Sequence, residues 1–122
     1  MPQEIAQKPQ RLRSGAFALC FAASLPLLQR VAREHGYALS VHGSMATDLD
    51  LIAAPWTEEA TDAEMLIEAL RASINGFFRD HVPGLSNPAF KPHGRLAWSI
   101  YTQDGESPYL DISVMPRSLP CP

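Results

Sequence analysis

The chain has 122 residues, of which 46% are hydrophobic and 19% are charged. That length suits one domain with a modest core, and the composition excludes an intrinsically disordered chain. The net charge of −3 argues against a dedicated nucleic-acid binder, because such proteins usually carry a basic excess. No apolar run reaches the roughly 18 residues that a membrane-spanning helix needs.

The two cysteines, Cys20 and Cys121, indicate a reducing compartment. One internal and one penultimate cysteine do not form the disulfide framework of a small secreted domain. Residues 11–13 and 15–28 do have the charged and apolar parts of a secretory signal. Because the apolar stretch continues into an amphipathic helix, we expect a cytoplasmic protein with no membrane partner.

The first segment predicts a tail followed by a helix. Residues 1–13 are polar and contain two prolines, so we expect a flexible tail ahead of one domain at 14–116. Small and apolar residues favour one kinked helix or two short ones at 14–35, and Gly36 is a stop signal. Residues 117–122 are rich in proline and are expected to form an irregular tail.

The middle of the chain predicts two strands and a second helix. Residues 37–42 and 48–53 alternate in polarity as half-buried strands do. Thr61, with Glu64 three residues later, has the pattern of a capping box, in which each side chain satisfies a backbone donor of the other residue. We therefore expect a helix from this point to about Phe78.

The last third predicts a loop and a hairpin. Residues 80–94 contain three prolines and two glycines, which favours a long loop. Residues 96–102 and 109–115 are predicted strands around an Asp-Gly turn at 104–105. The order α-β-β-α-β-β predicts an α+β fold, in which a small mixed sheet of about four strands carries helices on one face.

A short motif at the start of the second strand points to chemistry. Asp48 and Asp50 alternate with apolar residues, so in a strand their carboxylates project from the same face. Two such carboxylates repel each other unless a cation neutralises them, and oxygen ligands suit Mg²⁺ or Mn²⁺. The preceding turn, Gly43-Ser44, offers the backbone N–H groups and the hydroxyl that a phosphate needs. Metal and phosphate side by side is the arrangement of phosphoryl transfer.

A third carboxylate lies in the last predicted strand. Asp111 stands between the apolar residues Leu110 and Ile112, at a position where strand propensity disfavours aspartate. Departures from local preference are expected at functional sites. If this strand lies near Asp48 and Asp50, three carboxylates converge, and three can hold the two ions of an in-line displacement.

These motifs resemble the nucleotidyltransferase superfamily typified by DNA polymerase beta, especially its minimal single-domain members. The resemblance implies that Asp48, Asp50 and Asp111 ligate Mg²⁺ or Mn²⁺ and that Asp111 helps to deprotonate a hydroxyl acceptor. It implies that Gly43 and Ser44 hold the phosphates of a nucleoside triphosphate (NTP). The activity implied is transfer of a nucleotidyl group from the NTP to the acceptor.

Two further observations bear on this interpretation. Lys91 and Arg95 lie together at the entry to a strand and are predicted to contact phosphate, although such a cluster is also typical of a solvated loop. The motifs, with the run 91–95, also resemble short bacteriophage and prophage proteins of unknown activity. Only three residues, 45–47, separate the Gly-Ser turn from the first aspartate, a shorter spacing than in most nucleotidyltransferases.

The short spacing leaves a second hypothesis open. A catalytically inactive protein on the same scaffold, such as a phage-type inhibitor or adaptor, would bind a host protein or a nucleotide instead. A domain of this size also has little surface for choosing an acceptor, so a partner protein or a homodimer would complete the site. Trp56 and Trp98 are predicted to be core residues and not platforms for base stacking.

Overall fold

The computed structural model describes residues 23–43, 48–77, 84–101 and 109–117. The helices are α2 (Leu25–Glu34) and α3 (Ala63–Ser73), with short 3-10 turns η1 (Ile74–Phe77) and η2 (Pro92–Gly94). The strands are β1 (Tyr37–His42), β2 (Leu49–Pro55), β3 (Gly84–Leu85), β4 (Ala89–Lys91), β5 (Arg95–Tyr101) and β6 (Tyr109–Val114).

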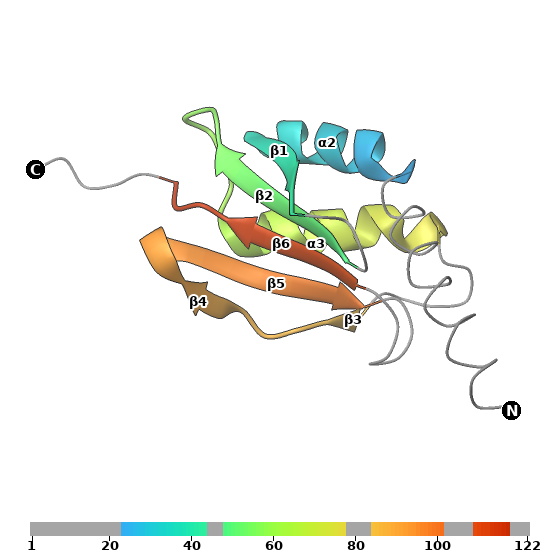
Figure 1. Cartoon of the computed structure of the whole chain (residues 1–122). Coiled ribbons are helices and arrows are strands. Elements are labelled where there is room, and N and C mark those ends of the chain that lie inside the picture. Colours follow the sequence, from blue (N-terminus) through green and yellow to red (C-terminus); the bar gives the residue numbers. More distant parts are fainter. Residues whose placement is uncertain (1–22, 44–47, 78–83, 102–108, 118–122) are drawn as a thin grey trace, which may run out of the picture.

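The six strands form one mixed sheet. Its order is β1-β2-β6-β5-β3, with the short β4 also pairing with β5. Strands β2 and β6 run parallel, whereas the other pairs are antiparallel. Strand β6 therefore lies between two strands that precede it in the chain, near the centre of the sheet (Figure 1).

The two described helices, α2 and α3, cover the same face of this sheet (Figure 1). Side chains from that face of the strands pack with the apolar sides of α2 and α3 in one core. This core includes Leu28, Tyr37, Leu39, Leu49, Leu51, Leu66, Ile67, Leu70, Ile74, Trp98, Ile100, Leu110 and Ile112. The predicted α+β class with helices on one face is confirmed, with six strands where about four were predicted.

The ends of the helices show one confirmed prediction and one that is wrong. Helix α2 ends before Gly36, whose φ of 86° suits glycine. The N-cap of α3 is Asp62 and not Thr61, because the Asp62 carboxylate accepts from the Met65 amide at 2.9 Å. The hydroxyl of Thr61 instead lies 3.2 Å from Nδ1 of His35. The cap therefore lies one residue later than the capping-box pattern predicted.

Two other predictions need correction. The segment 80–94 is not all loop, because β3, β4 and η2 form within its described part and both strands pair with β5. Trp98 is buried as predicted, but Trp56 is 79% exposed, because it follows the last residue of β2 and lies beyond the helix-covered face. The predicted tail at 1–13, the first helical stretch at 14–22 and the turn at 104–105 lie outside the described residues.

None of the helices in the described part of the chain combines the length and apolar character needed to cross a bilayer.

Candidate functional site

A row of four polar residues crosses the face of the sheet opposite the helices. His42 of β1 pairs with Asp50 of β2, Asp50 pairs with Asp111 of β6, and Ser99 of β5 pairs with Asp111. Residues in register on neighbouring strands project from the same face. The four polar side chains therefore share one face, and their apolar sequence neighbours in β2, β5 and β6 fill the core on the other.

Asp50 and Asp111 form the centre of this row. Their strands are adjacent and parallel, and neighbouring strands lie only about 4.8 Å apart, so the two carboxyl groups are close. Burial raises the pKa of Asp50, and the negative charges of Asp111 and Asp48 raise it further, whereas His42 lowers it. The folded chain thus holds two acids where ionising both is unfavourable, which is the condition that a bound cation would relieve.

The turn after β1 passes very close to Asp50. Gly43 has a φ of 84°, and a Cβ atom at this position would lie 2.6 Å from Oδ2 of Asp50. Any other residue would therefore be strained in its backbone and would collide with the carboxylate. Gly43 thus lies against Asp50, whereas Ser44 lies outside the described residues.

Two serines that the sequence pattern did not indicate hold Asp111 and its neighbour strand. The Ser99 hydroxyl donates to Oδ1 of Asp111 at 2.8 Å. The backbone N–H of Ser99 donates to Oγ of Ser86 at 2.8 Å, and the Ser86 N–H donates to the Ser99 carbonyl at 2.9 Å. The pairing of Ser99 with Asp111 depends on the register of β5 with β6. A single serine in a strand sequence does not predict such a partner.

The row opens onto a cleft of about 290 Å³. Lys91 lines the cleft from β4, so one of the two predicted phosphate-binding cations shares it with the carboxylates. Arg95 does not line it, and its guanidinium donates to Ser113 and to the Pro92 carbonyl. The cleft is lined by His42, Asp50, Ser86, Asn87, Ala89, Lys91, Ala97, Ser99, Asp111 and Ser113.

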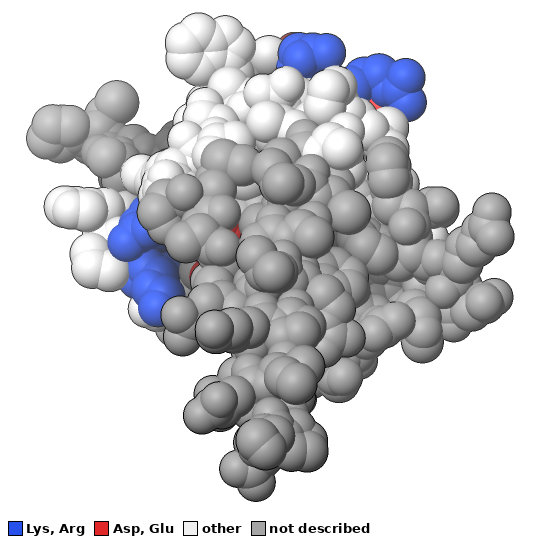
Figure 2. All heavy atoms as spheres, turned by 45° about the vertical axis from the view of Figure 1, so that its right-hand side comes forward, with Lys and Arg blue, Asp and Glu red and all other residues white. Residues whose placement is uncertain are grey.

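The surface of the molecule carries both charges in the view of Figure 2, where a group of Lys and Arg atoms on the left lies close to small patches of Asp or Glu atoms. A cation next to acidic groups suits a ligand that carries both phosphate and a metal ion, because the two charges of the site then have separate partners.

The three predicted metal ligands differ in how closely the structure places them to one another. Within the described residues, no group of three or more His, Cys, Asp or Glu side chains is arranged to hold a metal ion. Asp50 and Asp111 form a pair, and Asp48 lies one residue before β2, near enough for its charge to affect Asp50. The pair still fits Mg²⁺, which commonly uses one or two carboxylates and takes its other ligands from water and phosphate.

Comparison with known proteins gives one similar structure. The sequence matches no protein-family model and no curated protein. The crystal structure of the Cid1 poly(U) polymerase with MgGTP bound is similar, at 14% sequence identity and a TM-score of 0.47. The match covers 80% of this chain and 32% of that chain, so this chain spans less than half of the polymerase structure.

Proposed function

We propose that this protein is nucleotidyltransferase-like and binds a divalent cation together with an NTP on the open face of its sheet. The observation that carries the proposal is the parallel register of Asp50 with Asp111, which unites carboxylates from distant parts of the sequence on the face of the sheet that neither described helix covers. Asp48 would complete the acidic group from the start of β2, and the cation would be Mg²⁺ or Mn²⁺.

The residues of the cleft have separate roles in this proposal. The Lys91 ammonium would hold phosphate oxygens, and the backbone N–H groups of the turn at Gly43-Ser44 would do the same. The site would act mainly by positioning and by stabilising charge. A bound Mg²⁺ would neutralise charge on the phosphates.

The proposed reaction transfers a nucleotidyl group to a hydroxyl. A bond forms between the acceptor oxygen and the α-phosphorus of the NTP, and the bond from that phosphorus to the pyrophosphate oxygen breaks. The hydroxyl proton would pass to Asp111, whose Oδ1 already accepts from Ser99. This hydrogen bond would fix the carboxylate for that role, since a held acceptor loses less entropy when it binds its next partner.

Metal titration tests the binding part of the proposal. Mn²⁺ should raise the melting temperature of the wild-type protein, because a ligand at about 100 times its Kd stabilises the folded state by about 2.7 kcal/mol. The substitutions Asp50→Asn and Asp111→Asn should each abolish this shift. Asp62→Asn is the matched control, since it removes a carboxylate elsewhere and asparagine caps a helix as well as aspartate. An unchanged Mn²⁺ response in both site variants would disprove the proposed site.

A specific observation supports a second function. The cleft has a volume of about 290 Å³, just below the range of about 300–1,000 Å³ for ligand pockets. A site of this size suits a protein that binds a small phosphate compound or a host protein without catalysis, as in a phage-type inhibitor or adaptor. Incubation with an α-³²P-labelled NTP, Mn²⁺ and a pool of RNA and small hydroxyl acceptors separates the two. Label transferred by wild type but not by Asp111→Asn identifies an enzyme, whereas Mn²⁺ binding without transfer favours the binding protein.

A further inference from the structure

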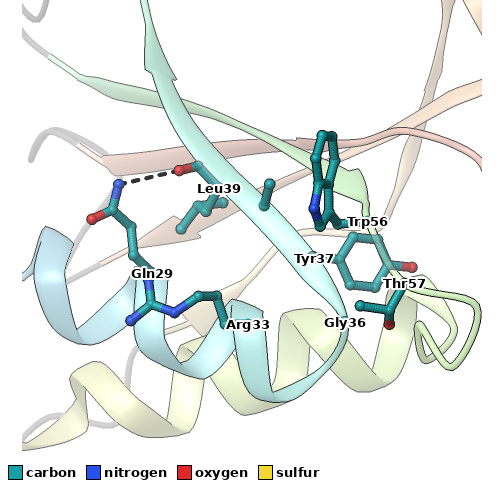
Figure 3. Close-up of a pocket in the computed structure, with 8 residues that line it drawn as sticks. Gln29, Arg33, Gly36, Tyr37, Leu39, Trp56 and Thr57 are labelled. Carbon is teal, nitrogen blue, oxygen red and sulfur yellow. Dashed lines mark hydrogen bonds between the residues drawn. The ribbon is translucent and has the colours of Figure 1, made fainter.

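A second hollow lies away from the acidic cleft. It has a volume of about 440 Å³ and shares no lining residue with that cleft. Figure 3 shows it between α2, the start of β1 and the segment that follows β2. It is lined by Gln29, Arg33, Gly36, Tyr37, Ala38, Leu39, Trp56 and Thr57.

The hollow follows the backbone edge of β1. Four consecutive residues, Gly36–Leu39, line it, although neighbouring side chains in a strand point to opposite faces. A surface shared by consecutive residues must therefore run along the backbone. Strand β1 is the first strand in the order of the described sheet, so its outer edge has no described strand beside it.

Backbone groups of two residues, Tyr37 and Leu39, face this edge. The Leu39 carbonyl points outward, because it accepts from Nε2 of Gln29 at 3.2 Å (Figure 3). Outward and inward residues alternate along an antiparallel strand, so Tyr37 also points outward, opposite Pro55, which has no N–H to donate. The Tyr37 carbonyl and the Leu39 N–H are thus directed to the hollow, and within the described residues no hydrogen bond to either is present.

The walls of the hollow add an aromatic ring and a positive charge. Trp56 is 79% exposed, and Figure 3 shows its ring beside β1. Arg33 comes from the exposed side of α2 and forms no ion pair within the described part of the chain. Tryptophan and arginine are the residue types that protein interaction sites favour, and here one of each lines the same hollow.

We propose that this hollow binds an extended, acidic peptide segment of a partner protein, which adds a strand to β1. Such a segment would hydrogen-bond to Tyr37 and Leu39, place an apolar side chain against Trp56 and direct a carboxylate to Arg33. Because the Leu39 carbonyl already accepts a hydrogen bond from Gln29, the partner segment would form only a short ladder of backbone hydrogen bonds with β1. Affinity would therefore depend on the two side-chain contacts as well as on the backbone.

A second copy of this chain fits the same edge less well. A symmetric contact uses the same patch on both subunits, so it would bring the two Arg33 side chains into the same interface. Like charges placed together in an interface disfavour the association. A partner segment that carries carboxylates removes this repulsion and supplies the opposite charge.

Nuclear magnetic resonance titration with defined peptides tests this inference. The probe is an acetylated and amidated heptapeptide in which valine and glutamate alternate, and its charge control has lysine in place of glutamate. The glutamate peptide should shift the Leu39 amide and the Trp56 indole resonances, and the lysine peptide should bind at least about fivefold more weakly. A version of the glutamate peptide with N-methylated central residues should also bind more weakly, because it cannot extend the sheet.

Variants assign the contacts to individual residues. Trp56→Ala should weaken binding of the glutamate peptide by about tenfold or more, and Arg33→Ala by about fivefold. Phe90→Ala is the control for the tryptophan, since Phe90 is 89% exposed but does not line the hollow, and Arg30→Ala is the control on α2. Both controls should bind as the wild type does.

Several results would overturn the inference. Equal binding of the glutamate and lysine peptides would remove the role of charge, and equal binding of the N-methylated peptide would remove the added strand. The absence of any shift at Leu39 and Trp56 would rule out the site. Concentration-dependent shifts of these resonances without peptide would assign the edge to a second copy and overturn the proposed partner. None of these outcomes depends on metal binding at Asp50 and Asp111.

Discussion

The same strands contribute to a packed core on one face of the sheet and to the acidic cleft on the other. In β2, Leu51 is fully buried beneath the helices, whereas its neighbour Asp50 faces the open cleft with a raised pKa. In β6, Ile112 and Asp111 repeat this division. Because successive residues of a strand alternate between faces, one short segment can supply both a packed core and an electrostatically unfavourable site. Core packing and the acidic site are therefore separated residue by residue within each strand.

Core truncation should give the largest effect and is the strongest test of this division. Leu51→Ala removes a side chain that is 0% exposed, so we expect a loss of about 2–5 kcal/mol in the free energy of unfolding. The neighbouring variant Ile52→Ala acts on the open face, where the side chain is only partly buried, and should lose clearly less. Urea denaturation of both variants measures the difference. Equal losses would mean that the open face is also part of a packed core.

A hydrogen-bond variant tests how the open face is held. Ser99→Ala removes the donor to Asp111 Oδ1, and a hydrogen bond to a charged group in a partly exposed site contributes about 1.5 kcal/mol. Ser99→Thr retains a hydroxyl and should keep most of this stability. Urea unfolding at pH 7 gives both values. If the threonine variant is as unstable as the alanine variant, packing and not the hydrogen bond accounts for the effect.

The smallest expected effect is in the dependence of stability on pH. The pKa of Asp50 is raised above 3.8 in the folded state, chiefly by burial and then by Asp111. Between 3.8 and that raised value, the folded state binds more protons than the unfolded state, so stability falls as pH rises through this window. Asp50→Asn should make the fall shallower and should leave the metal-free protein more stable than wild type at pH 7.

The measurement for this prediction is the free energy of urea unfolding from about pH 3.5 to 7 in the presence of a chelator, which keeps divalent ions away from the site. If the free energy of unfolding changes with pH in the same way in wild type and Asp50→Asn, the pKa of Asp50 is the same in the folded and the unfolded state. A steeper fall in the variant would contradict the sign of the raised pKa.

Alternating polarity allowed much of the fold to be predicted. The apolar residues around Asp50 and Asp111 predicted which face each strand buries, and Gly36 predicted the end of α2. These signals are local, since they depend on residues only one or two positions apart. The pattern also predicted that Asp48, Asp50 and Asp111 would converge if their strands were neighbours. The described strands bring Asp50 and Asp111 into register.

Other features depend on distant partners and could not be predicted from local pattern. Strand β4 carries the exposed Phe90 and pairs only through its register with β5, so its sequence looks like a loop. Tryptophan is a residue type that is expected in a core, and Trp56 is exposed only because it lies beyond the end of β2. Ser99 gains its role from Asp111, its partner on the next strand.

The central place of β6 has a consequence for how the protein is made. The ribosome synthesises β1, β2 and β5 before it reaches Tyr109, yet β6 must enter between β2 and β5. Until β6 pairs with them, β2 and β5 each have an unpaired edge, and such edges favour aggregation. Pairing across so many intervening residues also slows folding. The pairing of β6 with β2 therefore joins the two parts of the described sheet and also brings Asp50 and Asp111 together.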